Sequence, residues 1–321
     1  MGINAPAHRG ARRRRAGARR PSVTSDETPA RVGPTAPACQ TAGMDAPTLP
    51  ARPLTSAPPG TFGGVAGLLT DIDDTLTRDG AIEPAARAAL QALAAAGVPV
   101  IAVTGRPMGW SRPFAAAWPL VAIVAENGAV MLWRDAAGAV QVDYAQDAAT
   151  RVANAARLQA VAARVLAEVP GARLAQDSPG RVTDIAVDHA EHARLDAAAV
   201  ARVVALMQAA GMHATVSSIH VNGWFGDHDK WSGACWAVRA RLGRDLAAEA
   251  GRWVYVGDST NDQAMFARFA LSVGVANLRD FADRLHTWPA WITDAARGAG
   301  FAELARALLQ ARRADAASGS A

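Results

Sequence analysis

The chain has 321 residues, half of them hydrophobic, which is enough for one large domain or two smaller ones. It contains no apolar run of the eighteen or more residues that a membrane-spanning helix needs, and its two cysteines, Cys39 and Cys235, form neither a metal-binding nor a disulfide pattern. The composition therefore argues against a membrane protein and against a disulfide-stabilised secreted protein, and it favours the reducing cytoplasm.

The positive charge of the chain is concentrated in its first 60 residues. The formal net charge is +4, but residues 1–60 hold nine arginines and only three acidic residues, so the remainder is close to neutral. This segment is rich in Pro, Ala, Thr, Ser and Arg and has no apolar periodicity, so we expect a disordered tail. Three explanations stay open: translation begins at Met44, the tail is inert, or its six arginines between positions 12 and 20 bind nucleic acid or an anionic surface.

The first elements after the tail alternate between strand and helix. Pro84 in a first turn and Gly97 at a stop position delimit a helix over residues 82–96. Short apolar runs predict buried strands at residues 65–70, 98–103 and 120–125. This alternation predicts an α/β fold with a doubly wound parallel sheet.

Polar residues stand where these three strands end. Asp71 follows the first strand, Thr104 follows the second, and Asn127 lies in the turn after the third. In a doubly wound sheet, ligands bind at the carboxyl ends of the strands. The sequence therefore predicts a functional site at this edge of the sheet.

Residues 130–225 interrupt the alternation, and we predict that they form a small α/β insert with an antiparallel sheet. The expected elements are a hairpin of residues 131–133 and 140–144, helices at 149–169 and 195–210, a strand at 181–187, and a second hairpin of 213–217 and 220–224. The parallel pattern then resumes with helices at 232–242, 262–270 and 300–309 and strands at 252–256, 271–275 and 291–293.

The expected domain division follows from this pattern. Residues 1–60 form the tail, 61–129 the first part of the core, 130–225 the insert, 226–312 the second part of the core, and 313–321 a disordered C-terminus.

Lys230 is the only lysine of the chain, beside thirty-two arginines. Arginine carries a wide planar fork, whereas lysine carries a compact ammonium, so a single lysine indicates a position that the fork does not fit. The alternative is that Lys230 survives by chance on the surface. Acidic and hydroxyl residues accompany it in a set order: Asp71-Ile72-Asp73-Asp74-Thr75, Thr104-Gly105-Arg106, Lys230 and Gly257-Asp258-Ser259-Thr260-Asn261-Asp262.

These four stretches resemble the four motifs of the haloacid dehalogenase superfamily of phosphohydrolases. The resemblance runs from about residue 65 to about residue 310 and is closest to the Cof-like branch, which includes sugar-phosphate phosphatases. It implies a Rossmann-like core with a cap domain inserted between the second and third motifs. At Asp74 the chain departs from the Cof-like pattern, where glycine is usual.

Two carboxylates of the first motif suit the hydrolysis of a phosphate monoester. Asp71, at the tip of the first strand, is placed to attack phosphorus and form an aspartyl-phosphate. Asp73 projects to the same side of an extended chain, so it can protonate the leaving oxygen and then activate water. The alternative for two nearby aspartates is a strand-end turn or a helix cap.

Carboxylates that face a phosphate need a cation, and Mg²⁺ prefers oxygen ligands of this kind. The resemblance implies that Asp71, the backbone carbonyl of Asp73 and Asp258 hold the ion. Asp262 would hold a metal-bound water or orient Lys230.

The phosphate would be bound by three further groups and by Lys230. Thr104 offers a hydroxyl and Gly105 a backbone amide, while Lys230 neutralises charge. Asn261 either contacts the phosphate or fixes the loop.

Substrate selectivity is expected to depend on the insert and on loops that face the strand tips. Trp224 could stack on a sugar, although packing in the core is the commoner use of such a residue. His220 and His228 lack metal-ligand spacing and are expected to be structural or solvated. The candidate specificity residues are Arg106, Arg181, Asp184, Asp188, Asn222 and Trp224.

We therefore predict a Mg²⁺-dependent phosphatase that acts through a phospho-aspartate on a small phosphorylated metabolite, foremost a sugar phosphate. A phosphomutase of the same superfamily is the first alternative. A nucleic-acid or anionic-surface binder that uses the arginine tail is an alternative from a different class. No membrane partner is expected.

Overall fold

The computed structural model describes residues 51–318. The expected disorder of residues 1–50, the start at Met44 and the arginine-rich segment therefore lie outside the described residues. Within the described range, no helix is long and apolar enough to cross a membrane.

The predicted α/β fold with a mostly parallel sheet is confirmed. Nine strands follow the order β1-β15-β14-β13-β2-β5-β6-β7-β8, and every neighbouring pair from β1 to β6 is parallel, while β6, β7 and β8 pair antiparallel. In this order the strands are Arg52–Pro53, Trp291–Ile292, Leu271–Gly274, Trp253–Gly257, Gly67–Thr70, Val100–Val103, Ala122–Ala125, Val130–Arg134 and Val140–Tyr144.

Helices cover both faces of this sheet. Successive residues of a strand point to opposite sides, so an apolar strand presents apolar side chains to both faces. Leu68 belongs to the apolar cluster beneath α1, α2 and α8, whereas Leu69 belongs to the cluster beneath α5, α6 and α7. The two faces are therefore buried, as a parallel sheet requires. These helices span Pro84–Ala95 (α1), Met108–Ala117 (α2), Lys230–Leu242 (α5), Leu246–Glu249 (α6), Gln263–Phe266 (α7) and Arg297–Ser318 (α8).

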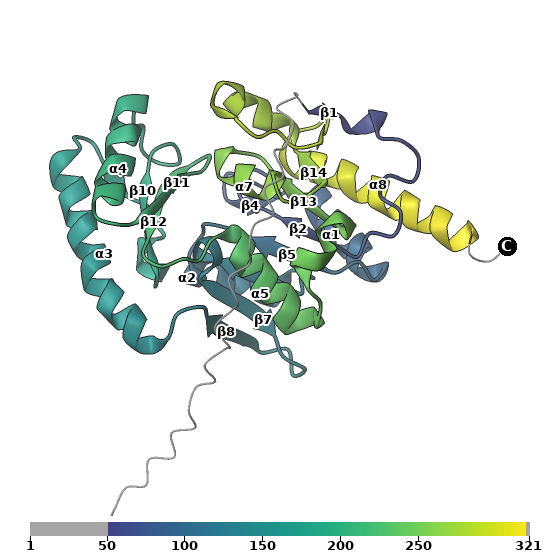
Figure 1. Cartoon of the computed structure of the whole chain (residues 1–321), viewed down its shortest axis with the longest axis horizontal. Coiled ribbons are helices and arrows are strands. Elements are labelled where there is room, and N and C mark those ends of the chain that lie inside the picture. The colour runs from purple at the N-terminus through teal and green to yellow at the C-terminus, as the bar shows by residue number, and fades with distance from the viewer. Residues whose placement is uncertain (1–50, 319–321) are drawn as a thin grey trace, which may run out of the picture. The chain divides into compact units, whose positions relative to one another are not determined.

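The insert forms a second, four-stranded antiparallel sheet with the order β11-β12-β10-β9 (Figure 1). Its apolar face carries Val187 and Val221 and packs against helices α3 and α4. Its other face carries polar residues such as Asp184 and Asn222, and Asn222 reaches the core. The elements are α3 (Ala148–Glu168), β9 (Arg173–Leu174), β10 (Asp184–Asp188), α4 (Ala197–Ala209), β11 (His213–Val216) and β12 (His220–Trp224).

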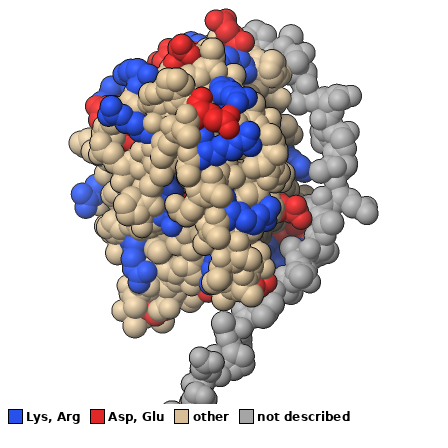
Figure 2. All heavy atoms as spheres, turned by 90° about the vertical axis from the view of Figure 1, so that its left-hand side faces the viewer, with Lys and Arg blue, Asp and Glu red and all other residues tan. Residues whose placement is uncertain are grey.

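The outer face of the insert carries mixed charge. Figure 2 shows basic and acidic side chains side by side over this face, and Glu168 of α3 pairs with both Arg164 and Arg202. Such interspersed charge differs from the basic stripe that tracks a nucleic-acid backbone.

The first boundary between core and insert differs from the prediction. The hairpin β7–β8, which we expected in the insert, continues the main sheet: Leu132 pairs with Ile123, and the side chains of residues 130–132 are buried on both faces. The insert therefore begins after Tyr144 rather than at residue 130. A hairpin has the same local pattern whichever sheet it joins, so only the pairing partner distinguishes the two cases.

Both ends of the described chain are more ordered than expected. Arg52 pairs with Trp291 and the side chain of Leu54 is buried, so the tail ends before residue 52 rather than at 60. At the other end, α8 continues to Ser318, and Asp315 accepts a hydrogen bond from the backbone N–H of Gly64 at 2.9 Å. The expected disorder of residues 313–318 is therefore wrong.

Short elements complete the fold. Helix α2 was not expected because Pro113 lies inside it, and proline normally ends a helix. The remaining elements are the hairpin β3–β4 (Thr77–Arg78, Ala81–Ile82) and 3-10 turns at Leu54–Ser56, Glu126–Gly128, Ser178–Gly180, Ala250–Arg252, Thr260–Asp262 and Ala276–Arg284.

Candidate active site

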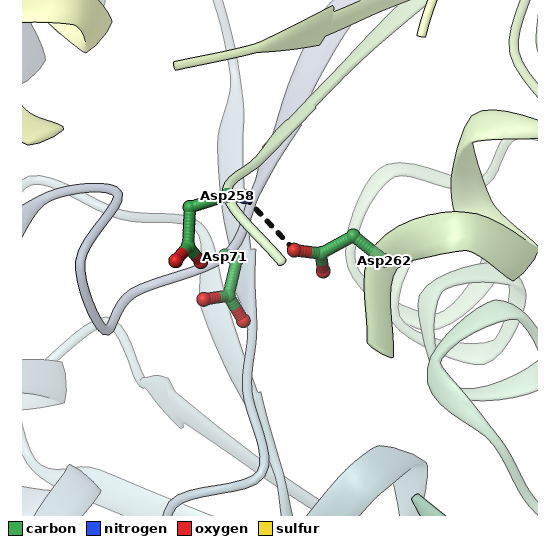
Figure 3. Close-up of side chains that lie close together, drawn as sticks. All are labelled: Asp71, Asp258 and Asp262. Atoms are coloured by element: carbon green, nitrogen blue, oxygen red, sulfur yellow. Dashed lines mark hydrogen bonds between the residues drawn. The ribbon is translucent and has the colours of Figure 1, made fainter. Parts of the chain in front are cut away.

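Three buried carboxylates converge at the carboxyl ends of two neighbouring strands. Asp71 follows β2 and Asp258 follows β13, and the backbone N–H of Asp71 donates to the carbonyl of Val256 at 2.9 Å. Asp262 lies one short turn after Asp258, and an oxygen of each carboxylate lies within 4.8 Å of the others (Figure 3). The parallel pairing of the two strands brings together residues that are 187 positions apart.

The turn after β13 aims Asp262 at this centre. One oxygen of Asp262 accepts the backbone N–H groups of Asp258 and Ser259, at 2.9 and 3.1 Å. A side chain at Gly257 would place its Cβ only 2.4 Å from the Asp262 carboxyl carbon, so this position requires glycine. The other oxygen of Asp262 accepts hydrogen bonds from Tyr255 and Lys230.

Lys230 is buried between two of the carboxylates. Its Nζ lies 2.7 Å from Asp71 Oδ1 and 2.8 Å from Asp262 Oδ1, and the side chain is 6% exposed. The alternative that this lysine survives by chance on the surface is therefore wrong. Lys230 is the first residue of α5, where Asp229 caps the helix by accepting the N–H of Ser232.

Burial and like charge shift the ionisation of this centre. Burial raises the pKa of Asp71 to about 8; Lys230 opposes the shift and the Asp262 carboxylate adds to it. Burial, Asp262 and Asp71 raise the pKa of Asp258 well above its usual value. Burial disfavours the ammonium of Lys230, but Asp262 and Asp71 outweigh it and raise the pKa of the lysine.

The donor set fits a hard divalent cation. Asp71, Asp258 and Asp262 share only one ammonium, that of Lys230. Among the described residues, the hydrogen bonds to the Asp258 carboxylate come from neutral side chains, Thr75 and Asn277, at 3.4 Å each. Carboxylate oxygens with unneutralised charge are the ligands that Mg²⁺ prefers.

Asp73 points to a different partner. Both of its oxygens accept from Arg106 Nε at 3.0 Å, and Arg106 Nη2 lies 2.9 Å from Oδ1. Its carboxylate therefore stays outside the cluster of three. Asp71 and Asp73 nevertheless line the same cavity, in agreement with the expectation that the two side chains project to one side.

This cavity lies between the strand ends and the insert. Core residues Asp73 and Thr104 line one side, and His220 and Asn222 of the insert line the other. A larger cavity of about 290 Å³ adjoins it and includes Lys230. Asn261 lines both cavities, which together form the crevice between core and insert.

Thr104 and Gly105 shape the loop at the end of β5. The Thr104 hydroxyl accepts the backbone N–H of Arg106 at 3.1 Å. At Gly105, an added Cβ would lie 3.2 Å from the amide oxygen of Asn127 and 3.3 Å from that of Asn222, which leaves little room for a side chain. Both residues line the smaller cavity.

Three of the candidate specificity residues bind one another. Arg181 Nη1 lies 2.9 Å from the Asp184 carboxylate and donates to the Gly105 carbonyl at 2.9 Å. Asn222 donates to Asp184 at 3.2 Å and to the same carbonyl at 3.3 Å. These side chains tie the insert to the loop after β5, and of the three only Asn222 lines a cavity.

The other three candidates have separate positions. Asp188 accepts backbone N–H groups of residues 190–193, so it holds a loop and lines neither cavity. Trp224 lines the larger cavity, stacks between His213 and His228, and donates its Nε1–H to the His228 carbonyl at 2.8 Å. Arg106 lines the smaller cavity.

Sequence reasoning missed several residues that surround Arg106. Asp177 and Glu191 both bind its guanidinium, at 3.1 and 2.7 Å, and His220 Nε2 lies 2.9 Å from Glu191. Burial opposes the ionisation of Glu191, but the hydrogen bonds from His220 and Arg106 outweigh it and lower the pKa to about 2. No local pattern announces these contacts, because 85 residues separate Arg106 from Glu191.

The fold and the site place three carboxylates at the ends of parallel strands. A model of the haloacid dehalogenase-like hydrolases matches residues 68–159. The match spans the first two motifs and covers less than a third of the chain, so this part of the chain is similar to the haloacid dehalogenase-like hydrolases. The predicted resemblance is thus confirmed, and the findings support an enzyme of the phosphatase class.

Solved structures share this fold at low sequence identity. A Thermoplasma acidophilum protein is 15% identical with a TM-score of 0.58, and the match covers 76% of this chain and 98% of that chain. A HAD/COF-like hydrolase from Plasmodium vivax is 18% identical (TM-score 0.56, 77% and 96% covered), and the sucrose-phosphatase of Synechocystis is 13% identical (0.54, 75% and 96%). No curated protein matches the chain.

Proposed function

We propose that the protein is a Mg²⁺-dependent phosphatase that hydrolyses a small phosphate monoester, foremost a sugar phosphate, through a phospho-aspartate. The observation that carries the proposal is the arrangement of Asp71: its carboxylate faces a cavity shared with Asp73 and contacts the buried ammonium of Lys230. A nucleophile and an acid thus line one small space, and a buried cation contacts the nucleophile.

In the first step an oxygen of Asp71 attacks phosphorus and the bond from phosphorus to the ester oxygen breaks. Asp73 donates a proton to the departing oxygen, so the alcohol leaves neutral. In the second step Asp73 takes a proton from water while the water oxygen attacks phosphorus. The bond to Asp71 then breaks, which releases inorganic phosphate and restores both carboxyl groups.

The other residues of the cavity would bind and orient the phosphate. Thr104 and Gly105 line the wall beside Asp73, and Asn261 lies across the cavity. Lys230 holds Asp71 in place through its 2.7 Å contact and offsets negative charge near the phosphate. Arg106 fixes the direction of Asp73 by binding both of its oxygens.

Asp71, Asp258 and the backbone carbonyl of Asp73 would hold Mg²⁺. When bound, the ion supplies positive charge that offsets the repulsion between phosphate and carboxylates. Asp262 already accepts four hydrogen bonds, from Tyr255, Lys230 and two backbone N–H groups, so it acts behind these ligands.

Phosphate release from a panel of sugar, polyol and small-acid phosphate esters tests the proposal. We expect release with Mg²⁺, loss of release with EDTA, and a fall of at least about 10³-fold in Asp71→Asn. Asp283→Asn, an exposed aspartate outside the site, is the matched control and should retain full activity. If folded, metal-loaded protein releases no phosphate but moves the phosphoryl group between hydroxyls of a hexose phosphate, the phosphomutase alternative holds instead.

A further inference from the structure

Arg106 lines the smaller cavity, and three carboxylates already bind it. Its guanidinium lies 2.9 Å from Asp73, 3.1 Å from Asp177 and 2.7 Å from Glu191, and its side chain is 4% exposed. Two of these carboxylates come from the insert. An arginine surrounded in this way has no charge left for an anionic ligand.

The other cation of the crevice is also neutralised. Lys230 binds Asp71 and Asp262. Among the described residues that line the two cavities, Lys230 and Arg106 are the lysine and arginine side chains. Lys230 stands beside the proposed phosphate site, so a second anionic group on a substrate would find no unpaired lysine or arginine in the described lining.

The larger cavity offers uncharged hydrogen-bonding groups and aromatic rings instead. Gln208, Thr215 and Asn261 line it together with Trp224 and Trp231. The hydroxyl of Thr215 and the indole N–H of Trp231 are buried without a hydrogen-bond partner in the described structure. Neutral groups of this kind can bond the hydroxyl groups of an uncharged remainder, whereas an ionised group would be buried there without an opposite charge, which is costly.

Glu191 is held in place by its surroundings. Asp188 accepts the backbone N–H of Glu191 at 2.9 Å and those of the residues on either side of it. The carboxylate of Glu191 then bridges Arg106 and His220, at 2.7 and 2.9 Å. The loop therefore delivers one carboxylate to two residues, Arg106 and His220, that line the smaller cavity.

We propose, on the basis of the function above, that the part of the substrate beyond its phosphate is hydroxylated and uncharged, and that Glu191 excludes anionic leaving groups by occupying Arg106. Glu191 acts through Arg106, because it removes the free positive charge that a carboxylate or second phosphate would need.

Matched substrate pairs test the substrate class. The kcat/KM for phosphate release is measured with glycerol phosphate against 3-phosphoglycerate, and with a hexose monophosphate against the corresponding bisphosphate. We expect the ester with the uncharged remainder to be preferred by at least about tenfold in each pair. Equal or greater activity with the acidic member overturns this inference but leaves the phosphatase intact, whereas no metal-dependent release from any ester refutes the proposed function itself.

Glu191→Gln tests whether the charge of Glu191 sets the preference for uncharged leaving groups. The amide keeps the size of the side chain and removes its charge, so we expect the preference for glycerol phosphate over 3-phosphoglycerate to fall by about tenfold. Glu168→Gln, an exposed glutamate of α3 on the far face of the insert sheet, should leave the ratio unchanged. An unchanged ratio in Glu191→Gln, with a thermal midpoint equal to that of the wild type, overturns the role of Glu191; if that variant does not fold, the wild-type ratios still decide the substrate class.

Discussion

Asp74 occupies a backbone conformation that side chains rarely adopt. Its φ is +53°, in the left-handed region where glycine carries no steric cost. This explains why glycine is usual at the corresponding position of the Cof-like pattern. In this chain the Asp74 carboxylate accepts from Arg297 Nε at 2.7 Å, and Arg297 N–H donates to Asn277, which also bonds the Asp74 carbonyl. The aspartate thus ties the first motif to the start of α8.

Two substitutions separate the backbone from the ion pair at this position. Asp74→Gly and Asp74→Ala both remove the pair with Arg297, which is partly exposed and contributes about 1 kcal/mol or less. Only alanine retains the cost of the left-handed conformation. We therefore expect the free energy of unfolding of Asp74→Ala to be about 1 kcal/mol lower than that of Asp74→Gly. Urea unfolding of the two variants measures this difference, and equal stabilities would contradict the explanation.

Lys230 tests whether the site needs a compact ammonium or only a positive charge. Lys230→Arg preserves the charge but places a wider group between Asp71 and Asp262, which lie on either side of the buried Nζ. We expect phosphate release to fall by about 10²-fold or more because the fork displaces the nucleophile. Arg239→Lys, an exposed position on the same helix, is the reverse control and should retain activity. Full activity of Lys230→Arg would show that chance, rather than shape, preserved this lysine.

At the scale of elements, the position of Lys230 depends on how closely α5 approaches the turn Glu126–Gly128. A Cβ at Gly233 would lie 2.5 Å from the Cα of Gly128, and a Cβ at Gly128 would lie 2.0 Å from the carbonyl oxygen of Asp229. Both glycines are therefore needed for backbone contact between helix and turn. This contact places the first residue of α5, Lys230, over the strand ends.

Gly233→Ala tests this dependence. The added methyl group meets backbone atoms of Gly128 that cannot rotate away, so we expect the variant to lose about 1–3 kcal/mol of stability. Phosphate release should also fall, because any shift of α5 moves the ammonium of Lys230. Gly251→Ala is the control, since no atom lies within 4 Å of its added Cβ. The measurements are the unfolding midpoints and the kcat values of the two variants. Unchanged values in both variants would argue against tight packing between α5 and the turn.

At the scale of the whole molecule, one edge strand of the main sheet comes from the very beginning of the described chain. Strand β1 pairs with β15, and the side chain of the adjacent Leu54 is buried in the core beneath α8. These contacts join the beginning of the described chain to the segment before α8. The folded unit therefore includes residues that the composition assigned to the tail.

Truncation tests where the folded unit begins. A chain that starts at Met44 retains β1 and Leu54 and should unfold at the same temperature as the full chain. A chain that starts at Thr61 loses both, and burial of a leucine side chain alone contributes about 1.5–3 kcal/mol, so we expect a lower thermal midpoint. Equal midpoints for the two truncated chains would show that β1 adds nothing to stability.

The sequence predicted most of the fold and the meeting of polar residues at the strand ends because those features follow from local patterns. Asp71, Thr104 and Asp258 each follow a short apolar run, and parallel strands bring such positions to one edge. The pattern did not reveal that β7–β8 joins the main sheet, since hairpins look alike in either sheet. It also did not reveal α2, because Pro113 concealed the helix.

The polar side chains of the insert show what the sequence could predict and what only the tertiary structure decided. The sequence alone was sufficient to name Arg181 and Asp184 as polar residues of the insert that could face the site, but it did not single out Glu191. Only the folded chain decided that Arg181 binds Asp184 and that Glu191 binds Arg106. The physical reason is that a charged group pairs with whatever opposite charge the fold brings within reach, and in this crevice that partner can lie 85 residues away.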